Sequence, residues 1–375
     1  MDNKLYDKIE STGEWWLDPW WEDRNWLGAE RYPIELLSEA VGVLKEFFPA
    51  EWAKQLFDNP QQNIIMPILI GHNAMALGAL FHLGFMCKRA RSTQGFSSIV
   101  KRLRESDSDS AFFELEMGDI FLEKEIQVDF PRPGAQKTPD IIAHCSDIKI
   151  EIECKRLRTE AWNYWENNLT TMIMSVVSEI ADRDGIELQI ELNDRITDIC
   201  FDDEKYPGFN EAISRGIVDK IKNTVVKKLE GQKLPVEFTV SGLMVGQALC
   251  KGDPGGTYVR GAAISNIAKL RRIITNGMFR GLPQLSGKVP GVLCIYSDYL
   301  PEPELVRVIL DSLTIDSSKS VQSQFSPMSA LLLFPRQTIF ERNPPLLFEN
   351  KNALFSFPQL EAAEHIKKSF APLVA

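Results

Sequence analysis

The sequence has few cysteines and no close pair of them. Its six cysteines are spread over 375 residues, and no two stand at the CxxC spacing of zinc knuckles or dithiol redox motifs. Several lie inside apolar, strand-like runs, where a free cysteine behaves as a small hydrophobic residue. This usage argues against disulfides and suits a reducing compartment, so we expect a cytoplasmic protein. The cysteines are Cys87, Cys145, Cys154, Cys200, Cys250 and Cys294.

Other familiar signals are lacking too. The chain has no Walker loop, no dinucleotide-binding glycine fingerprint, no internal repeat and no low-complexity tract. Its N-terminus is polar and acidic, which is not the composition of a secretory signal. The long apolar run at residues 63–87 is interrupted by Pro67, His72, Asn73 and His82. We therefore expect a buried pair of helices with two packing histidines there, rather than a membrane span, and no membrane partner.

Basic residues are outnumbered, since 42 Lys and Arg against 52 Asp and Glu give a formal net charge of −10. No global positive field would draw such a chain to nucleic acid. Two segments nevertheless contain no acid, residues 59–104 and residues 254–297. Each is either a solvated helix face or a surface that contacts phosphates. Their basic residues are Lys88, Arg89, Arg91, Lys101, Arg102 and Arg104, and then Arg260, Lys269, Arg271, Arg272, Arg280 and Lys288.

Three regions are expected along the chain. Residues 1–105 form an aromatic-rich, mostly helical region, residues 106–345 an α/β region, and residues 346–375 a tail with a short helix at 360–370. The first thirty residues contain Trp15, Trp16, Trp20, Trp21 and Trp26, with acids between them. Tryptophans can stack on bases, but the acids would repel phosphate, so packing against the body of the protein is favoured.

Hydrophobic periodicity assigns the elements of the α/β region. A period of two indicates strands, and spacings of three and four indicate helices. We expect the additional strands after the first three to extend the same sheet. Expected strands are 125–130, 141–145, 148–154, 186–192, 236–243, 289–296 and 330–334. Expected helices begin near 112 and cover 162–180 and 209–229, the last two closed by Gly185 and Gly231.

The residues that carry chemistry lie at 138–157, TPDIIAHCSDIKIEIECKRL. In the second strand of this stretch Ile150, Ile152 and Cys154 alternate with charged residues. Glu153 and Lys155 therefore share the opposite face, and a turn at 146–147 would bring Asp140 alongside them. Two close carboxylates suit a hard divalent cation, and the ammonium group adds a positive charge for an attacking hydroxide or a phosphate.

This arrangement resembles the PD-(D/E)xK nuclease superfamily. The matching residues are Pro139-Asp140 and Glu153-Cys154-Lys155, and Phe112-Phe113-Glu114-Leu115-Glu116 is similar to the family's first helix, which carries a further acid. Glu114 is the preferred candidate for that acid over Glu116. The expected order of helix, three strands, helix and strand agrees with the fold of that family. The resemblance implies a restriction-endonuclease-like mixed sheet flanked by helices, here with an N-terminal mostly helical extension.

The resemblance also implies roles and partners. Asp140, Glu153 and the Cys154 carbonyl would bind Mg²⁺, for which Mn²⁺ could substitute, while Lys155 positions the attacking water and Glu114 holds a second metal or orients solvent. The implied activity is phosphodiester hydrolysis, on DNA more often than RNA, in host defence, mobile elements or repair. A homodimer and a partner protein of a larger system are compatible with it. Expected phosphate contacts are Arg156, Arg158, Lys269, Arg271, Arg272 and Arg280.

Two other interpretations of the motif remain open. The charges could form an ordinary solvated strand face, or the fold could serve only as a nucleic-acid-binding or scaffold protein. Neighbouring residues do not offer a different chemistry. Cys154 points away from Glu153 if the strand is regular, so it is a poor nucleophile. His144 and Glu151 lie too far along their strands to join the site, and structural roles are expected for His144.

Overall fold

The computed structural model describes residues 34–355 with gaps, and it divides them into two compact units. Unit 1 comprises residues 1–157, 273–298 and 303–375, and unit 2 comprises residues 158–272 and 299–302. The tryptophan-rich segment and the helix expected at 360–370 lie outside the described residues. Also outside them are residues 1–33, 50, 53–54, 56–62, 64, 66–73, 106, 132–137, 146–147, 158–159, 194–195, 197–210, 241–242, 253–255, 261–265, 298–299, 317, 336–344 and 356–375.

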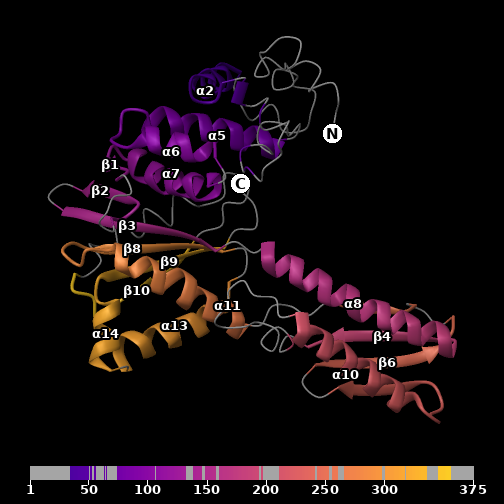
Figure 1. The fold of residues 1–375 in the computed structure, drawn as a ribbon. Helices are drawn as coiled ribbons and strands as arrows, with labels where there is room; N and C mark the ends of the chain where they lie inside the picture. The colour runs from indigo at the N-terminus through magenta and orange to yellow at the C-terminus, as the bar shows by residue number, and fades with distance from the viewer. Residues whose placement is uncertain are drawn as a thin grey trace. The chain divides into compact units, whose positions relative to one another are not determined.

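Unit 1 is built around a six-stranded sheet in the order β1-β2-β3-β8-β9-β10 (Figure 1). The first three strands pair antiparallel, β8 and β9 are parallel to β3, and β10 pairs antiparallel with β9. This α/β arrangement with a mixed sheet is the class expected from the sequence. The strands are β1 (Gln127–Asp129), β2 (Ile141–Cys145), β3 (Ile148–Leu157), β8 (Gly291–Ser297), β9 (Met328–Pro335) and β10 (Leu346–Glu349).

One face of this sheet is covered by helices from the N-terminal part of the chain (Figure 1). They are α2 (Ile34–Phe47), α5 (Ala74–Ala90), α6 (Phe96–Leu103) and α7 (Ser108–Leu122). Their apolar side chains share one core with the sheet, in which Leu44, Leu83, Phe112 and Ile152 are buried. Among the described helices, none is long and apolar enough to cross a membrane.

The remaining short helices of unit 1 follow unit 2 along the chain. They are η4 (Ile273–Met278, a π-helix), α12 (Phe279–Gly281), η5 (Leu282–Gln284), α13 (Pro303–Asp311), η6 (Ser312–Asp316, a π-helix) and α14 (Lys319–Phe325). Of these helices, η4 and α12 contact β3, the strand that carries Glu153 and Lys155.

The boundary expected near residue 105 does not separate two cores. The expected regions met between residues 105 and 106, where the sequence is polar, but Ser108 is buried and begins α7, which packs on α6 and on the sheet. The polar residues start a helix within unit 1 rather than mark the end of a domain. Helices on both sides of this position bury their apolar faces together, so residues 34–105 belong to the same unit as the strands.

Unit 2 has its own four-stranded sheet, in the order β5-β6-β4-β7, with α8 and α10 in the core beneath it. Residues of β4 and β6 such as Ile190 and Ala248 are buried against α8 and α10 residues such as Ile173 and Ile221. The elements are α8 (Glu160–Asp184), β4 (Ile186–Leu192), α10 (Glu211–Leu229), β5 (Val236–Val240), β6 (Met244–Cys250), β7 (Tyr258–Arg260) and α11 (Asn266–Arg272).

The expectation of one extended sheet is wrong in part, because the strands expected at 289–296 and 330–334 do extend the first sheet, as β8 and β9, but two others do not. The segments at 186–192 and 236–240 are strands, but they pair in unit 2 and not with β3. The parallel neighbour of β3 is β8, which follows residues 158–272 of unit 2 along the chain. Periodicity identified the strands, but it carries no information on which strand pairs with which. Strand β3 also continues to Leu157, so Lys155 lies within the strand and not at its junction with a helix.

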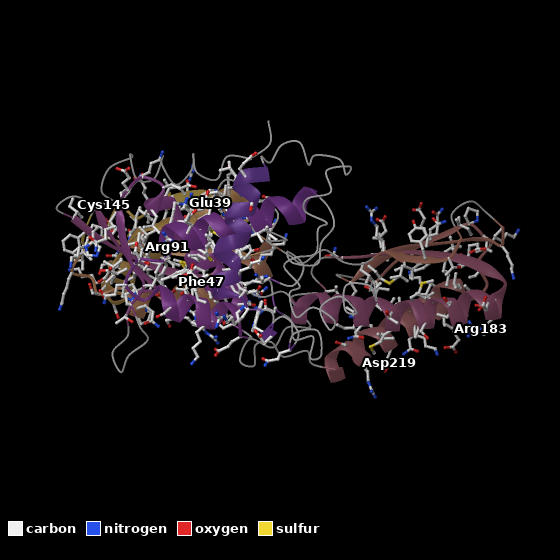
Figure 2. The ribbon with its side chains drawn as sticks, turned by 90° about the horizontal axis from the view of Figure 1, so that it is seen from above. Glu39, Phe47, Arg91, Cys145, Arg183 and Asp219 are labelled. Carbon is white, nitrogen blue, oxygen red and sulfur yellow. The ribbon has the colours of Figure 1, made fainter. Side chains whose placement is uncertain are left out.

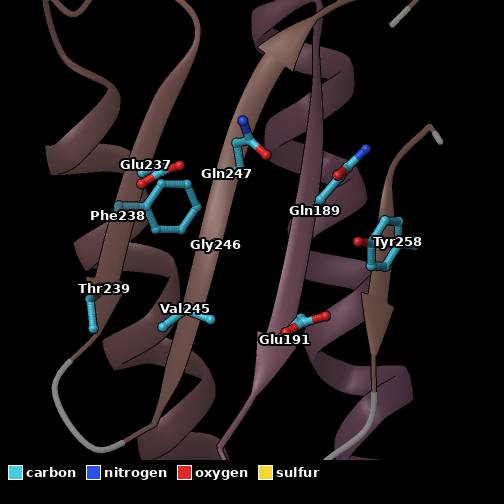
Figure 3. Close-up of a pocket in the computed structure, with 9 residues that line it drawn as sticks. All are labelled: Gln189, Glu191, Glu237, Phe238, Thr239, Val245, Gly246, Gln247 and Tyr258. Carbon is cyan, nitrogen blue, oxygen red and sulfur yellow. The ribbon is translucent and has the colours of Figure 1, made fainter. Parts of the chain in front are cut away.

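The outer face of the unit 2 sheet is polar (Figure 3). Cross-strand neighbours form a row across it, namely Glu237, Gln247, Gln189 and Tyr258. A shallow pocket of about 390 Å³ lies over this row. The inward-facing Phe238 lies against Gly246, where a Cβ atom would approach the phenyl ring to 2.5 Å.

Candidate active site

Asp140, Glu153 and Lys155 lie together in unit 1. Asp140 directly precedes β2, and the register pairs the next residue, Ile141, with Ile152 of β3. Asp140 Oδ2 accepts a hydrogen bond from the Cys154 backbone N–H at 2.9 Å, which fixes the carboxylate beside β3. Lys155 Nζ donates a hydrogen bond to Glu153 Oε1. The antiparallel pairing of β2 and β3 thus joins the two halves of the motif.

The two faces of β3 are used differently. Ile150, Ile152 and Cys154 belong to the core that includes α7, as the alternation predicted. Glu153 and Lys155 lie on the opposite face, next to Gly281 at the end of α12. A Cβ atom at Gly281 would lie 3.4 Å from Glu153 Cγ and 3.6 Å from Lys155 Cγ. The missing side chain lets this short helix approach the charged face of the strand closely.

Glu114 of α7 is the third carboxylate near this group. It is 3% exposed, and the negative charge of Asp140 contributes to its raised pKa. Arg102 of α6 holds it with two hydrogen bonds, from Nη1 to Oε2 at 2.5 Å and from Nη2 to Oε1 at 2.6 Å. Glu116 instead lies 3.8 Å from His82 Nε2. Of the two acids considered for this helix, Glu114 is thus the one near Asp140 and Glu153.

The three carboxyl groups have raised pKa values. Burial raises the pKa of Glu153 to about 8, with a further contribution from the negative charge of Asp140. Burial and the charge of Asp140 likewise raise the pKa of Glu114 to about 7, against the opposing effect of Arg102. The pKa of Asp140 is raised by burial, although Lys155 and the Cys154 N–H oppose the shift. A dry site with clustered negative charge favours a bound proton or a cation.

Burial lowers the pKa of the Lys155 ammonium group, but Glu153 and Asp140 more than offset this, and the net pKa is raised. Lys155 therefore stays charged at neutral pH and serves as a cation, not as a base. Burial raises the pKa of the Cys154 thiol well above its usual value, and Cys294 adds to the shift. The sulfur remains a protonated core group, in agreement with the expectation that it is no nucleophile.

The donor set suits a hard divalent cation. Glu153 Oε2 is buried and has no hydrogen-bond partner among the described residues, so one of its oxygens is available for a ligand. Asp140 supplies a second carboxylate, and Mg²⁺ accepts such oxygen donors together with waters and backbone carbonyls. Within the described part of the chain no group of three or more His, Cys, Asp or Glu could hold a metal ion. We therefore assign only two side-chain ligands for the cation, Asp140 and Glu153, and expect the Cys154 carbonyl as the third donor.

Arg156 does not occupy the phosphate-contacting position expected for it. It lies on the core face of β3, where Nη1 pairs with Asp109 Oδ2 at 3.1 Å and the guanidinium stacks 4.7 Å from the ring centre of Tyr296. The expectation was wrong because adjacent strand residues point to opposite faces, so the residue after Lys155 returns to the core side. Arg158, the other arginine proposed there, lies outside the described residues.

The second acid-free segment is only partly on the surface. Arg272 is 4% exposed, so it is not the surface phosphate contact that was expected. The pattern Lys-Leu-Arg-Arg on α11 places one arginine on the buried side, because four consecutive residues cover all sides of a helix. Arg271 is exposed and Lys269 is half-buried. Arg280 is exposed and immediately precedes Gly281, the residue that packs on Glu153 and Lys155.

Ion pairs neutralise most of the first acid-free segment. Figure 2 labels Glu39, the partner of Lys88 at 2.5 Å, and Phe47, whose carbonyl accepts a hydrogen bond from Arg104 Nε at 2.6 Å. Arg91, also labelled, is exposed. Further pairs join Arg89 to Asp119 and Glu123, Lys101 to Glu105, and Arg102 to Asp107 and Glu114. Acids outside the segment thus balance its charge, which a count within the segment could not reveal.

Two residues of the site were not expected from the sequence. Arg102 was counted only as part of a basic segment, and Gly281 was not considered. A signal for Arg102 was its place on the helix directly before the one that carries Glu114. His144 and Glu151 have structural roles: His144 Nε2 lies 2.8 Å from Asp129 Oδ2, and Glu151 Oε2 accepts the Ser286 N–H at 2.6 Å.

Comparisons with protein-family models, with curated proteins and with solved structures found no match to this chain.

Proposed function

We propose that unit 1 is a Mg²⁺-dependent nuclease domain that hydrolyses phosphodiester bonds, with DNA as the favoured substrate. The observation that carries the proposal is the site formed by Asp140, Glu153 and Lys155, in which a buried carboxylate oxygen lacks a partner beside a charged ammonium group. The sheet topology adds support. Three antiparallel strands follow α7, as the resemblance to PD-(D/E)xK nucleases implies, but the parallel neighbour of β3 is β8 and not the strand at 186–192.

Each residue has a role in this proposal. Asp140 and Glu153 would hold the ion, which supplies positive charge for the phosphodiester transition state and lowers the pKa of water. Lys155 would orient the attacking water and interact with the scissile phosphate through its ammonium group. Glu153 must lose its proton to do this, which requires the bound cation or high pH because its pKa is about 8. Arg280, exposed beside Gly281, is the favoured phosphate contact near the site.

Cleavage assays test the proposal. The purified full chain is incubated with linear, circular and single-stranded DNA and with RNA, in parallel samples containing Mg²⁺, Mn²⁺ or EDTA. We expect cleavage with either metal and none with EDTA. Asp140→Asn and Lys155→Ala should each reduce the rate by about 10²-fold or more, because the first removes a charge that binds the metal ion and the second a charge beside the scissile phosphate.

Glu151→Gln is the matched control. Glu151 lies on the same face of β3 as Glu153 but about 6–7 Å away, at roughly 3.3 Å per residue. Glutamine keeps an oxygen that can accept the Ser286 N–H, so this variant should cut like the wild type. Wild-type cleavage by Lys155→Ala would contradict the proposed chemistry. Metal binding and nucleic-acid binding without cleavage of any substrate would instead favour a non-catalytic binding protein on this fold.

A further inference from the structure

Arg102 forms a two-pronged ion pair with the buried Glu114 carboxylate, unlike an ordinary ion pair on the surface. Its two terminal nitrogens each donate to a different oxygen of Glu114, and its Nε donates to Asp107 Oδ2 at 2.8 Å. Glu114 is almost fully buried, whereas the side chain of Arg102 is 23% exposed. The guanidinium group therefore fixes the Glu114 carboxylate in one orientation and engages both of its oxygens.

The charges around the site show what this pairing does. With a divalent cation bound and the carboxyl groups ionised, Glu114, Asp107, Asp140 and Glu153 carry four negative charges, and Lys155 and Arg102 carry two positive ones. One divalent cation therefore neutralises the site, and a second would give it a net positive charge. In a buried environment the repulsion between the two cations is weakly screened. Without Arg102, the same site would have enough negative charge and one free carboxylate for a second ion.

We propose that Arg102 is a positioning residue that holds Glu114 out of metal coordination and thereby limits the site to a single divalent cation. The inference rests on the proposed metal site at Asp140 and Glu153. It assigns Glu114 a different role from the second-metal ligand expected from the sequence. Glu114 instead anchors α6 to α7 behind the site and contributes negative charge from a fixed position.

Helix α7 also offers a matched control. Arg89 binds Asp119 in the same two-pronged way, with Nε to Oδ1 at 2.6 Å and Nη2 to Oδ2 at 2.6 Å, and Asp119 is as deeply buried as Glu114. Arg89 forms ion pairs with Asp119 and Glu123, neither of which is assigned to the metal site, and removing this arginine leaves an equally buried carboxylate on the same helix. Arg89→Ala should therefore lower the stability of the fold in the same way as Arg102→Ala, without altering the metal site.

The experiment counts Mn²⁺ ions bound per chain, by electron paramagnetic resonance of free Mn²⁺ and by calorimetry, with no substrate present. The wild type and Arg89→Ala should bind one ion at the site. Arg102→Ala should bind two. Arg102→Ala combined with Glu114→Gln should return to one, because the carboxylate that would hold the second ion is gone. Arg102→Gln is the second single variant: it is neutral but can still donate a hydrogen bond to Glu114, so it should also bind two ions, and a folded Arg102→Gln protein that binds one would overturn the proposal.

The outcomes separate the two proposals. If the wild type binds no Mn²⁺ at Asp140 and Glu153, as judged by the Asp140→Asn variant, the metal site itself is wrong. If the wild type binds two ions, or if a folded Arg102→Ala variant still binds one, the role of Arg102 is overturned while the nuclease proposal stands. A second ion in Arg102→Ala that persists in the double variant would likewise reject Glu114 as its ligand.

Discussion

At the scale of the residue, the pKa of Glu153 links the site to stability. The folded value of about 8 lies well above the ordinary value of 4.5. Between these two values the unfolded chain has lost a proton that the folded chain keeps, so folding is favoured at low pH and this contribution is lost as pH rises through 8. Without divalent cations we expect the melting temperature to fall between about pH 5 and pH 8 through this group.

The Glu153→Gln variant measures that contribution. Glutamine does not titrate, so the fall in melting temperature over this pH range should be shallower than in the wild type, in thermal denaturation with EDTA. The difference corresponds to a few kcal/mol at most, on the order of 1.4 kcal/mol per pKa unit, and is shared with Asp140 and Glu114 because the three groups titrate together. An identical pH dependence in both proteins would show that Glu153 is not protonated in the folded state.

The sequence correctly predicted the strand face of those residues whose position depends only on local backbone geometry. Strand alternation alone places Glu153 and Lys155 together and Cys154 on the core side, and the structure has this arrangement. Arg156 and Arg272 were misplaced although periodicity alone puts each on a buried side, but the group that receives a buried arginine, such as Tyr296 for Arg156, lies far away along the chain. The pairing of Arg102 with Glu114 depends in the same way on how two helices pack.

At the scale of the element, the short helix α12 depends on having no side chain at Gly281. A Cβ atom there would approach Leu293 Cδ1 to 2.5 Å, and it would also touch Glu153 and Lys155. Gly281→Ala should therefore lower the free energy of unfolding by about 1–3 kcal/mol, as overpacking does elsewhere, and should reduce cleavage through displacement of β3 side chains.

Gly216 on α10 provides the comparison. A Cβ atom there meets nothing within 4 Å, and the position is exposed in the middle of a helix. Alanine should increase stability at this position by about 0.5–1 kcal/mol, because glycine loses more backbone freedom on folding. Chemical denaturation should therefore show a lower free energy of unfolding for Gly281→Ala and a higher one for Gly216→Ala than for the wild type. Stabilisation by both substitutions would contradict the close approach at Gly281.

Individual elements were predicted better than their pairing. Strands β2 and β4 have the bounds expected from alternation, and Gly185 and Gly231 follow the ends of α8 and α10 with left-handed φ angles. Strands β6, β7 and β10 were missed, the last two because three or four residues are too few to show a period. The assignment of β4, and of α8 before it, to the first fold unit failed. The bounds of a strand follow from its own residues, but the identity of the strand that it pairs with does not.

At the scale of the whole molecule, two separate cores suggest two separate unfolding events. The core of unit 1 and the core of unit 2 have no residue in common. We expect calorimetry to resolve two transitions. Ile221→Ala, in the unit 2 core, should lower the midpoint of one of them, and Ile99→Ala, in the unit 1 core, should lower the other. Each substitution removes a buried side chain and should cost about 2–5 kcal/mol. A single transition shifted by both variants would mean that the units fold as one.

The pairing of β3 with β8 sets the order in which the site is completed during synthesis. Glu151 pairs with Gly291, and residues 158–272 of unit 2 lie between them in the chain. When the strand with Glu153 and Lys155 leaves the ribosome, its parallel neighbour has not yet been made, and β3 remains an edge strand with unpaired backbone groups. Leu293, which pairs with Glu153 and supports Gly281, arrives with β8. A nascent chain would thus carry the whole motif without an assembled site until the residues of β8 have been translated.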